Sequence, residues 1–319
     1  GADGWHAYEV KSSTSVKDKY IPDAAVQWMV MQAAGLDVRS ISIVHINNQY
    51  ERRGDLDVQQ LFTIEDVTDQ VIEAVDELPG LTRELVEVMD LDEPPAVDIG
   101  PHCSDPYACA FMHHCWAHVP SGRSVFDVGG LRAKKKWALY EEGIVEMTDI
   151  PANAPLSPKQ REQVDMARSG ETIVRTETIR EWLGQLTWPV RHLDYETFSL
   201  AIPVLDGQRP YQRMPFQFSL HRQDRPGGEM QHTDFLHTAY GHDPRPAFAD
   251  ALIRACGTEG SILVYSIGFE RSVTEELMEA VPERADELQA IIDRMVDLIL
   301  PFRKRWFYTP AMNGRSSIK

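Results

Sequence analysis

The sequence predicts an α/β protein in which two globular domains are joined by a helical connector. Segments typical of β-strands alternate with amphipathic helical segments toward both ends of the 319-residue chain. Between them, residues 120–187 form short helical stretches interrupted by turn residues. Apolar residues make up 43% of the chain and charged residues 25%, which is typical of a globular protein that buries a core.

Residues 1–119 form the predicted first domain. Asp23 is expected to cap a helix that ends near residue 34. Residues 64–89 are acidic and amphipathic, and they predict two helices that break near Pro79. The expected strands are Trp5–Val10 and Ile41–Ile46.

Residues 120–187 are the predicted connector, and residues 188–319 are the predicted second domain. In the connector, Ser157-Pro158 opens a helix with proline at its first position. A further connector helix is expected over Leu131–Tyr140. The strands expected in the second domain are Val190–Tyr195, Pro215–His221, Met230–Phe235 and Ser261–Tyr265, and the helices are Pro246–Cys256, Glu270–Ala280 and Arg284–Leu300.

Charge and hydropathy limit the classes of partner. The formal net charge of −17 argues against broad electrostatic attraction to nucleic acid, although bound metals would offset part of it. The basic run Arg132–Lys136 is typical of a solvated helix face. No apolar run has the length of a membrane span and no signal-peptide pattern is present, so the sequence predicts a cytoplasmic protein that binds no membrane.

The most informative motif is Asp194-x-Glu196, which ends an apolar run and is followed by Thr197. Residues two apart on a strand point to one face, so the two carboxylates would project together. Mg²⁺ or Mn²⁺ would relieve their repulsion, and paired metals catalyse phosphodiester hydrolysis. The other interpretation is an ordinary exposed acidic strand end.

A second acidic motif, Glu9-x-Lys11, lies on the first predicted strand. The same spacing puts an acid and a lysine on one face, where the acid can hold a metal and the lysine can orient water or stabilise developing charge. Such pairs are also common on strands with no catalytic role.

Three cysteines, Cys103, Cys109 and Cys115, follow each other at Cys-x5-Cys-x5-Cys spacing. Three thiolates in a short segment favour iron–sulfur or Zn²⁺ over Mg²⁺. A zinc site completed by His102, His113 or His114 and a set of buried structural cysteines are the alternatives. Cys256 is expected to lie in the core.

The order of these features resembles the RecB-like branch of the PD-(D/E)XK nucleases, including the members that carry an iron–sulfur cluster. The resemblance assigns Glu9 and Lys11 to the (D/E)XK positions and Gln27 to the glutamine of the next helix, while Met31 departs from the usual aromatic. It implies a 4Fe-4S cluster on the cysteines, with Zn²⁺ as the alternative. The family's first aspartate and fourth cysteine lie upstream, so we expect the chain to begin inside a partial restriction-endonuclease-like domain.

The carboxyl-terminal third resembles the DnaQ-like (DEDD) exonucleases of the ribonuclease H-like fold. Asp194 and Glu196 match its first motif, and Glu270 matches its second with glutamate for aspartate and serine for asparagine at Ser266. Asp297 is expected to be structural. The final Ser316–Lys319 resembles the opening of a further helix, so the last acidic motif of the family is expected beyond the chain.

A closer resemblance is to a bacterial family of unknown function that joins these two nuclease types through a helical connector. It rests on the motifs around Phe198–Pro203, Gly207–Tyr211 and Pro215–Ser219. The last two motifs predict either a hairpin with an aromatic core or a lip over the metal site on which bases stack.

The sequence therefore predicts a metal-dependent nuclease, and more specifically an exonuclease, that hydrolyses DNA or RNA with Mg²⁺ or Mn²⁺, with DNA favoured over RNA. Glu9, Lys11 and Gln27 belong to one expected centre, and Asp194, Glu196 and Glu270 belong to the other. The competing prediction is a catalytically degenerate nucleic-acid-binding or scaffold protein with a structural iron–sulfur or zinc site.

Overall fold

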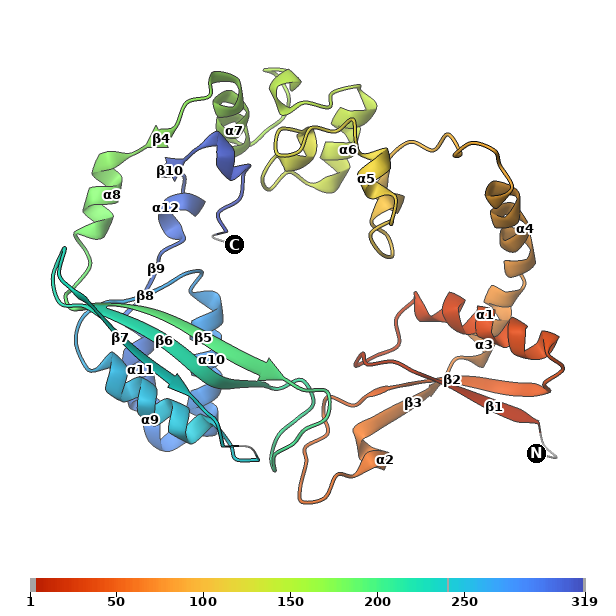
Figure 1. Cartoon of the computed structure of the whole chain (residues 1–319), viewed down its shortest axis with the longest axis horizontal. Helices are drawn as coiled ribbons and strands as arrows, with labels where there is room; N and C mark the ends of the chain where they lie inside the picture. Colours follow the sequence, from red (N-terminus) through yellow and green to blue (C-terminus); the bar gives the residue numbers. More distant parts are fainter. Residues whose placement is uncertain (1–3, 240, 318–319) are drawn as a thin grey trace. The chain divides into compact units, whose positions relative to one another are not determined.

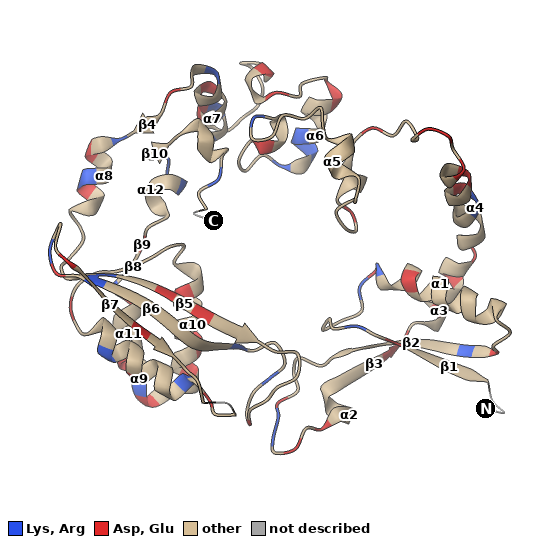
Figure 2. Cartoon of the chain, in the orientation of Figure 1, with Lys and Arg blue, Asp and Glu red and all other residues tan. Residues whose placement is uncertain are grey.

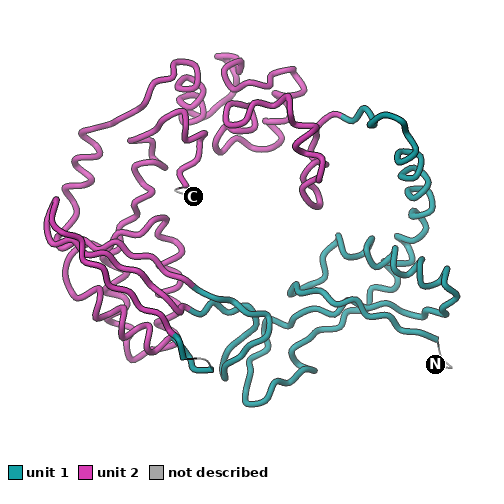
Figure 3. The backbone as a smooth tube through the Cα atoms, in the orientation of Figure 1, with its two compact units in different colours: residues 1–97, 197–214, 238–244 teal, residues 98–196, 215–237, 245–319 magenta. Residues whose placement is uncertain are grey.

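The computed structural model describes residues 4–239 and 241–317 and shows a mixed α/β protein with several sheets (Figure 1). Its chain divides into two compact units (Figure 3). Unit 1 contains residues 1–97, 197–214 and 238–244, and unit 2 contains residues 98–196, 215–237 and 245–319. The cysteine segment thus falls in unit 2, and these borders differ from the expected domains 1–119, 120–187 and 188–319. The domain boundaries stay a prediction.

Unit 1 is built on a three-stranded sheet of order β1-β2-β3, in which β1 and β2 are parallel and β2 and β3 antiparallel. The sheet packs against α1 and α3 through a core that includes Ala24, Trp28, Ile41 and Val71. Burial of these apolar side chains holds the helices on the sheet. The elements are β1 (Trp5–Val10), α1 (Tyr20–Ala33), β2 (Val38–Ile46), α2 (Val58–Leu61), β3 (Phe62–Asp66), α3 (Thr68–Val75) and α4 (Leu78–Met89).

Both predicted strands of the first domain are confirmed, and the three predicted helices are present as α1, α3 and α4, but their predicted starts and the predicted break near Pro79 are wrong. Helix α1 begins at Tyr20 after Lys19, so Asp23 lies inside the first turn and does not cap it. The carboxylate of Asp23 binds Lys11 instead. Residues 64–66 belong to β3, and Pro79 lies in the first turn of α4, where its missing N–H is harmless.

Residues 197–214, which run from the end of strand β5 (Val190–Ser199) to the start of strand β6 (Arg213–Gln223), belong to unit 1 and pair with the loop after β2. The backbone N–H of Arg52 donates to the carbonyl of Gln208 at 3.1 Å, and the N–H of Gly207 donates to the carbonyl of Arg52 at 2.8 Å. Farther along, the Tyr211 hydroxyl donates to the Ser12 carbonyl. This connection therefore reaches the chain just after Lys11.

The amino-terminal part of unit 2 is largely helical and has its own small core of Val125, Val128, Met147, Ile150 and Val164. The capping box that Ser157 makes with Gln160 at the start of α7 confirms the predicted Ser157-Pro158 helix start. The elements are η1 (Pro101–Cys103), α5 (Met112–Cys115), η2 (Val125–Asp127), α6 (Ala133–Glu141), η3 (Met147–Asp149), α7 (Pro158–Ser169), β4 (Ile173–Val174) and α8 (Thr176–Leu183).

The rest of unit 2 is a five-stranded sheet of order β7-β6-β5-β8-β9, with helices α9, α10 and α11 sharing its core. Strands β5, β8 and β9 are parallel, whereas β6 and β7 are antiparallel to each other. The elements are β5 (Val190–Ser199), β6 (Arg213–Gln223), β7 (Met230–Leu236), α9 (Arg245–Cys256), β8 (Ile262–Val264), α10 (Gly268–Ala280), η4 (Pro282–Arg284), α11 (Ala285–Ile292), β9 (Met295–Asp297), α12 (Leu300–Arg303), β10 (Phe307–Tyr308) and η5 (Pro310–Met312).

The predicted helix Arg284–Leu300 is wrong beyond Ile292. Helix α11 ends there, and Met295 pairs with Ile262 as the fifth strand begins. The spacing of the apolar residues in this stretch is compatible with a helix. In the structure, the backbone N–H and C=O groups of β9 bond to β8 in the sheet instead.

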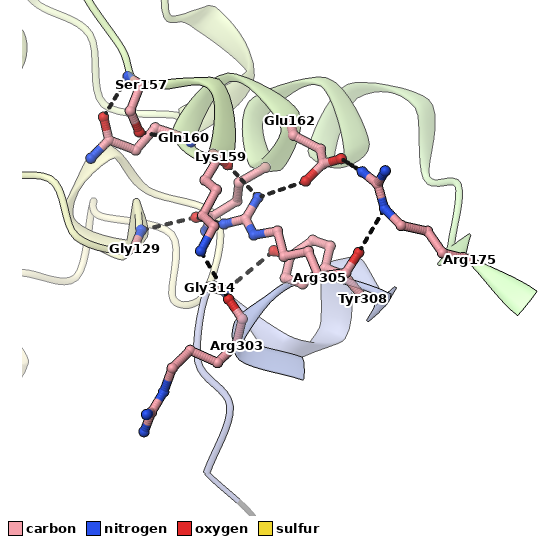
Figure 4. A network of polar contacts seen from close by, with 11 residues as sticks. Gly129, Ser157, Lys159, Gln160, Glu162, Arg175, Arg303, Arg305, Tyr308 and Gly314 are labelled. Atoms are coloured by element: carbon pink, nitrogen blue, oxygen red, sulfur yellow. Dashed lines mark hydrogen bonds and ion pairs between the residues drawn. The ribbon is translucent and has the colours of Figure 1, made fainter. Parts of the chain in front are cut away.

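The carboxyl-terminal segment is anchored on helix α7 by a buried polar network (Figure 4). Gln163 is 1% exposed, and its Oε1 accepts from the N–H of Gly129 at 2.9 Å and from Arg305 at 3.2 Å. Its amide donates to the Asp127 carbonyl at 2.9 Å. Arg305, itself 7% exposed, also faces Glu162 and the Tyr308 ring. Gln163 thus joins α7 to two other parts of unit 2, the segment Asp127–Gly129 and Arg305.

No helix among residues 4–239 and 241–317 combines the length and apolar character needed to cross a membrane.

We predict that Gln163→Ala lowers the free energy of unfolding by about 2–3 kcal/mol, because it leaves buried donors and an acceptor without partners. Urea denaturation followed by circular dichroism measures the change. The control is Gln185→Ala, which removes an exposed glutamine of the same unit and should cost less than about 0.5 kcal/mol. Equal losses in both variants would show that the network adds no stability.

Candidate functional site

Strand β5 carries the Asp194-x-Glu196 motif, and its pleat places successive side chains on opposite faces of the sheet. Leu193 and Tyr195 point into the core and are 4% and 2% exposed. Asp194 and Glu196 alternate with them and are exposed. The expected common face of the two carboxylates is therefore present, but the motif lies within the strand, because β5 continues to Ser199.

The two carboxylates line a pocket of about 640 Å³ that also contains Glu270. Figure 2 shows acidic residues on β5 and at the start of α10, the two elements that supply this group. The pocket is lined by His192, Leu193, Asp194, Tyr195, Glu196, Ser219, His221, Leu263, Tyr265, Ser266, Phe269, Glu270, Leu298 and Ser317.

Glu270 is the buried member of the acidic group, at 3% exposure. Its Oε2 is buried without a hydrogen-bond partner among the described residues. Burial, with a smaller contribution from the negative charges of Asp194 and Asp297, raises the pKa of Glu270 to about 7, although a backbone hydrogen bond lowers it. An unpartnered carboxylate oxygen beside other carboxylates is a fitting donor for a cation.

Asp297 has the structural role that the sequence predicts. It is 7% exposed, and its Oδ1 accepts backbone N–H bonds from Ser266 at 3.0 Å and Ile299 at 3.1 Å. Ser266 has a φ of 67°, so this bond helps to hold a strained turn directly before α10. Through that turn, Asp297 fixes the start of α10 and so the position of Glu270 in its first turn.

Glu9, Lys11 and Gln27 form a second polar cluster in unit 1 together with Asp23. The Lys11 Nζ lies 2.8 Å from Glu9 Oε1 and 2.5 Å from Asp23 Oδ2. Gln27 hydrogen-bonds to Asp23, and both this bond and the Lys11 bond lower the pKa of Asp23, the latter more strongly. Sequence reasoning missed Asp23 as a cluster member, although its position four residues before Gln27 on one helix was the available signal.

The two carboxylates hold Lys11 in its charged form. Hydrogen bonds to Asp23 and then to Glu9 raise the pKa of Lys11 to about 12. The Tyr20 ring centroid lies 5.3 Å from the Lys11 Nζ, which adds a cation–π contact. Lys11 is therefore suited to stabilise negative charge and not to accept a proton.

The three clustered cysteines are free thiols in different environments. Cys103 is buried, Cys115 is half-buried and Cys109 is exposed. The Cys109 N–H donates to the Cys103 carbonyl at 2.8 Å, and the Phe111 N–H donates to the Cys109 sulfur at 3.4 Å. Cys256 is fully buried in the sheet core, which confirms its expected position.

Within the described part of the chain, no three His, Cys, Asp or Glu side chains lie close enough together to form a ready-made metal site. The pocket at β5 brings Asp194, Glu196 and Glu270 to one cavity without drawing their oxygens together. The unpartnered Glu270 oxygen still makes this donor set chemically suitable for Mg²⁺ or Mn²⁺. The cysteines have suitable donor atoms for a cluster but are likewise not gathered.

A protein-family model matches part of this chain. A model of a domain of unknown function, DUF2779, matches residues 191–317. The match is consistent with the expected resemblance to a family of unknown function, but it covers less than half of the chain. The matched range contains Asp194, Glu196 and Glu270. No curated protein matches the chain. No solved structure matches it either.

We predict that the metal-free protein loses stability as the pH rises, because of Glu270. Its pKa rises from the ordinary value of 4.5 to about 7 on folding. The folded state therefore binds the extra proton, and this contribution to stability is complete below pH 4.5 and is lost as the pH rises through about 7. Urea denaturation in EDTA at pH 5 and pH 7.5 measures it.

The variant Glu270→Gln should flatten this pH dependence, whereas Glu279→Gln, an exposed glutamate on the same helix, should keep it. Mg²⁺ should also flatten it in the wild type, because a bound cation favours the charged carboxylate. A wild-type profile unchanged by Glu270→Gln would contradict the assignment.

Proposed function

We propose that the protein is a metal-dependent nuclease, with the pocket at β5 and α10 as its main hydrolytic centre. The observation that carries the proposal is the buried Glu270 Oε2, which has no partner among the described residues and lines one pocket with Asp194 and Glu196. Buried carboxylates are expected to be paired or to bind a cation. A divalent cation is the ligand that this group suits best.

The fold supports the same proposal. If the strands are numbered from β5 as first to β9 as fifth, the sheet has the order third, second, first, fourth, fifth. This is the strand order of ribonuclease H-like domains, in which the first strand is central and carries acidic residues. A fold alone does not define an activity, so the carboxylates of β5 and α10 carry the proposal.

In the proposed centre, Asp194, Glu196 and Glu270, which line one pocket, would hold Mg²⁺ or Mn²⁺. The bound ions would polarise the phosphate and lower the pKa of the attacking water. Asp297 holds the turn that orients Glu270, and Tyr195 anchors β5 by a 3.3 Å hydrogen bond to Thr274 of α10. The chain thus fixes the carboxylates on two elements that share one core.

Unit 1 carries the second proposed centre. There the charged Lys11 would stabilise negative charge on a phosphate, and Glu9 would hold a metal. Gln27 would keep Asp23 in place beside the lysine. This cluster supports a PD-(D/E)XK-like assignment by residue type, since an acid, a lysine and a helical glutamine meet at one site.

A catalytically degenerate nucleic-acid-binding protein is the second candidate. Two observations favour it: no three potential ligands converge among the described residues, and Lys11 is already paired with two carboxylates. Such a protein would bind nucleic acid without hydrolysing it.

We predict that the purified protein degrades single-stranded DNA from its ends with Mn²⁺ and not with EDTA. In a Lys11→Ala background, which removes the other proposed centre, Asp194→Asn should lower the rate at least about a hundredfold, the scale of losing an electrostatic group at a reaction centre. The control Asp286→Asn changes an exposed aspartate of α11 and should keep the rate. Turnover of the wild type in EDTA would rule out the metal mechanism.

We also propose a 4Fe-4S cluster on Cys103, Cys109 and Cys115, with Zn²⁺ as the alternative. Anaerobically purified protein should be brown and contain iron and sulfide by elemental analysis. The variant Cys109→Ser should lose the bound metal, while Cys256→Ser, a core cysteine, should keep it in the folded fraction. A colourless protein that contains zinc would establish the zinc alternative, and protein without either metal would leave the cysteines structural.

A further inference from the structure

Three histidines form a row across neighbouring strands of the unit 2 sheet. They are His192 on β5, His221 on β6 and His232 on β7, and these strands are adjacent in the order β7-β6-β5 (Figure 1). His221 and His232 are directly paired in the register, and their rings stack with centroids 4.5 Å apart and an angle of 26°. We call these residues the histidine row.

The row lies on the same sheet face as the carboxylates. His192 precedes Asp194 by two residues on β5, and His192, His221 and Ser219 line the pocket that contains Asp194 and Glu270. Phe218 and Leu220, which alternate with Ser219 and His221, are each 1% exposed in the core on the opposite face. The wall of the pocket beside the carboxylates is therefore made of histidine and serine.

These side chains are hydrogen-bond donors and flat rings in a region that is otherwise acidic. The Ser219 hydroxyl and His232 Nε2 lie 3.1 Å apart, which orients the His232 ring. No hydrogen bond of the described residues involves the His221 ring, so its nitrogens are available to a ligand. Asp234 pairs with Ser219 on this face but is not part of the pocket lining, so a ligand in the pocket meets His221 before Asp234.

We propose that His221 and Ser219 bind the nucleotide that adjoins the scissile phosphodiester, and this inference rests on the proposed nuclease function. A ring nitrogen of His221 donates to its phosphate, and the Ser219 hydroxyl also donates to it while the hydroxyl oxygen accepts from the Nε2–H of His232. The face of the His221 ring that His232 does not cover stacks on the base. His232 is a positioning residue that supports the His221 ring from behind by stacking. The carboxylates hold the reacting phosphate, and the histidine row holds the nucleotide next to it.

The test is calorimetric binding of deoxyadenosine 5′-monophosphate, a nucleotide that the reaction cannot hydrolyse further, to the full chain in Mg²⁺. His221→Ala should raise the Kd about tenfold, the effect of losing one hydrogen bond to a charged group. His232→Ala should raise it less, and His232→Phe, which keeps a stacking ring, should restore it. The matched control is Gln231→Ala on the same strand, whose side chain faces α9.

Deoxyadenosine tests recognition of the base alone, and inorganic phosphate tests recognition of the phosphate alone. We expect each to bind more weakly than the nucleotide and each to lose affinity in His221→Ala. A Kd for the nucleotide that is unchanged in His221→Ala would overturn the inference, as would undetectable binding to the wild type.

Failure of the proposed function is distinguishable from failure of this inference. If the wild type binds the nucleotide through His221 but degrades no DNA with Mn²⁺, the nuclease proposal fails and the binding site stands. If the protein degrades DNA, His221→Ala should raise KM about tenfold with little change in kcat. An active enzyme in which His221→Ala changes neither KM nor the nucleotide Kd would refute the binding site alone.

Discussion

The alternation of side chains along β5 is the constraint on which the rest of unit 2 depends. Leu193 and Tyr195 are fixed in the core, so Asp194 and Glu196 must face the other way. A shift of one residue in register would bury both carboxylates among apolar side chains and expose the core residues, which would be severely unfavourable. The same pleat in β6 buries Phe218 and Leu220 and turns Ser219 and His221 toward the pocket. Core packing thus determines the composition of the proposed site.

The two acidic clusters reduce the repulsion between their carboxylates in different ways. In unit 1, Glu9 and Asp23 share the ammonium group of Lys11, so the cluster carries its own counter-charge. In unit 2, burial and then the negative charges of Asp194 and Asp297 raise the pKa of Glu270, so its carboxyl group retains a proton more strongly. The first cluster is stable without an added ion, whereas the second gains most from one. This contrast makes the β5 pocket the stronger candidate for a cation-dependent activity.

Local patterns predicted much of the fold, and the errors occurred where distant partners decide. The strand Trp5–Val10 and the Ser157-Pro158 helix start follow from side-chain alternation and capping chemistry, both of which are readable within a few residues. The strand Met295–Asp297 was predicted as helix because its partner β8 lies far away in sequence. Asp23 was predicted as a helix cap because its bond to Lys11 spans separate elements. For the same reason, the burial of Glu270 and the histidine row could not be predicted from spacing alone.

Strand β5 also belongs to both compact units, since residues 190–196 lie in unit 2 and residues 197–199 in unit 1. The chain passes from one unit to the other at five points, which are 97/98, 196/197, 214/215, 237/238 and 244/245. Residues 197–214 complete the loop pairing around Arg52, so a gene rearrangement at 97/98 would separate the two sides of this pairing. Neither unit is one contiguous stretch of sequence, so neither can be exchanged as a single segment without carrying part of the other.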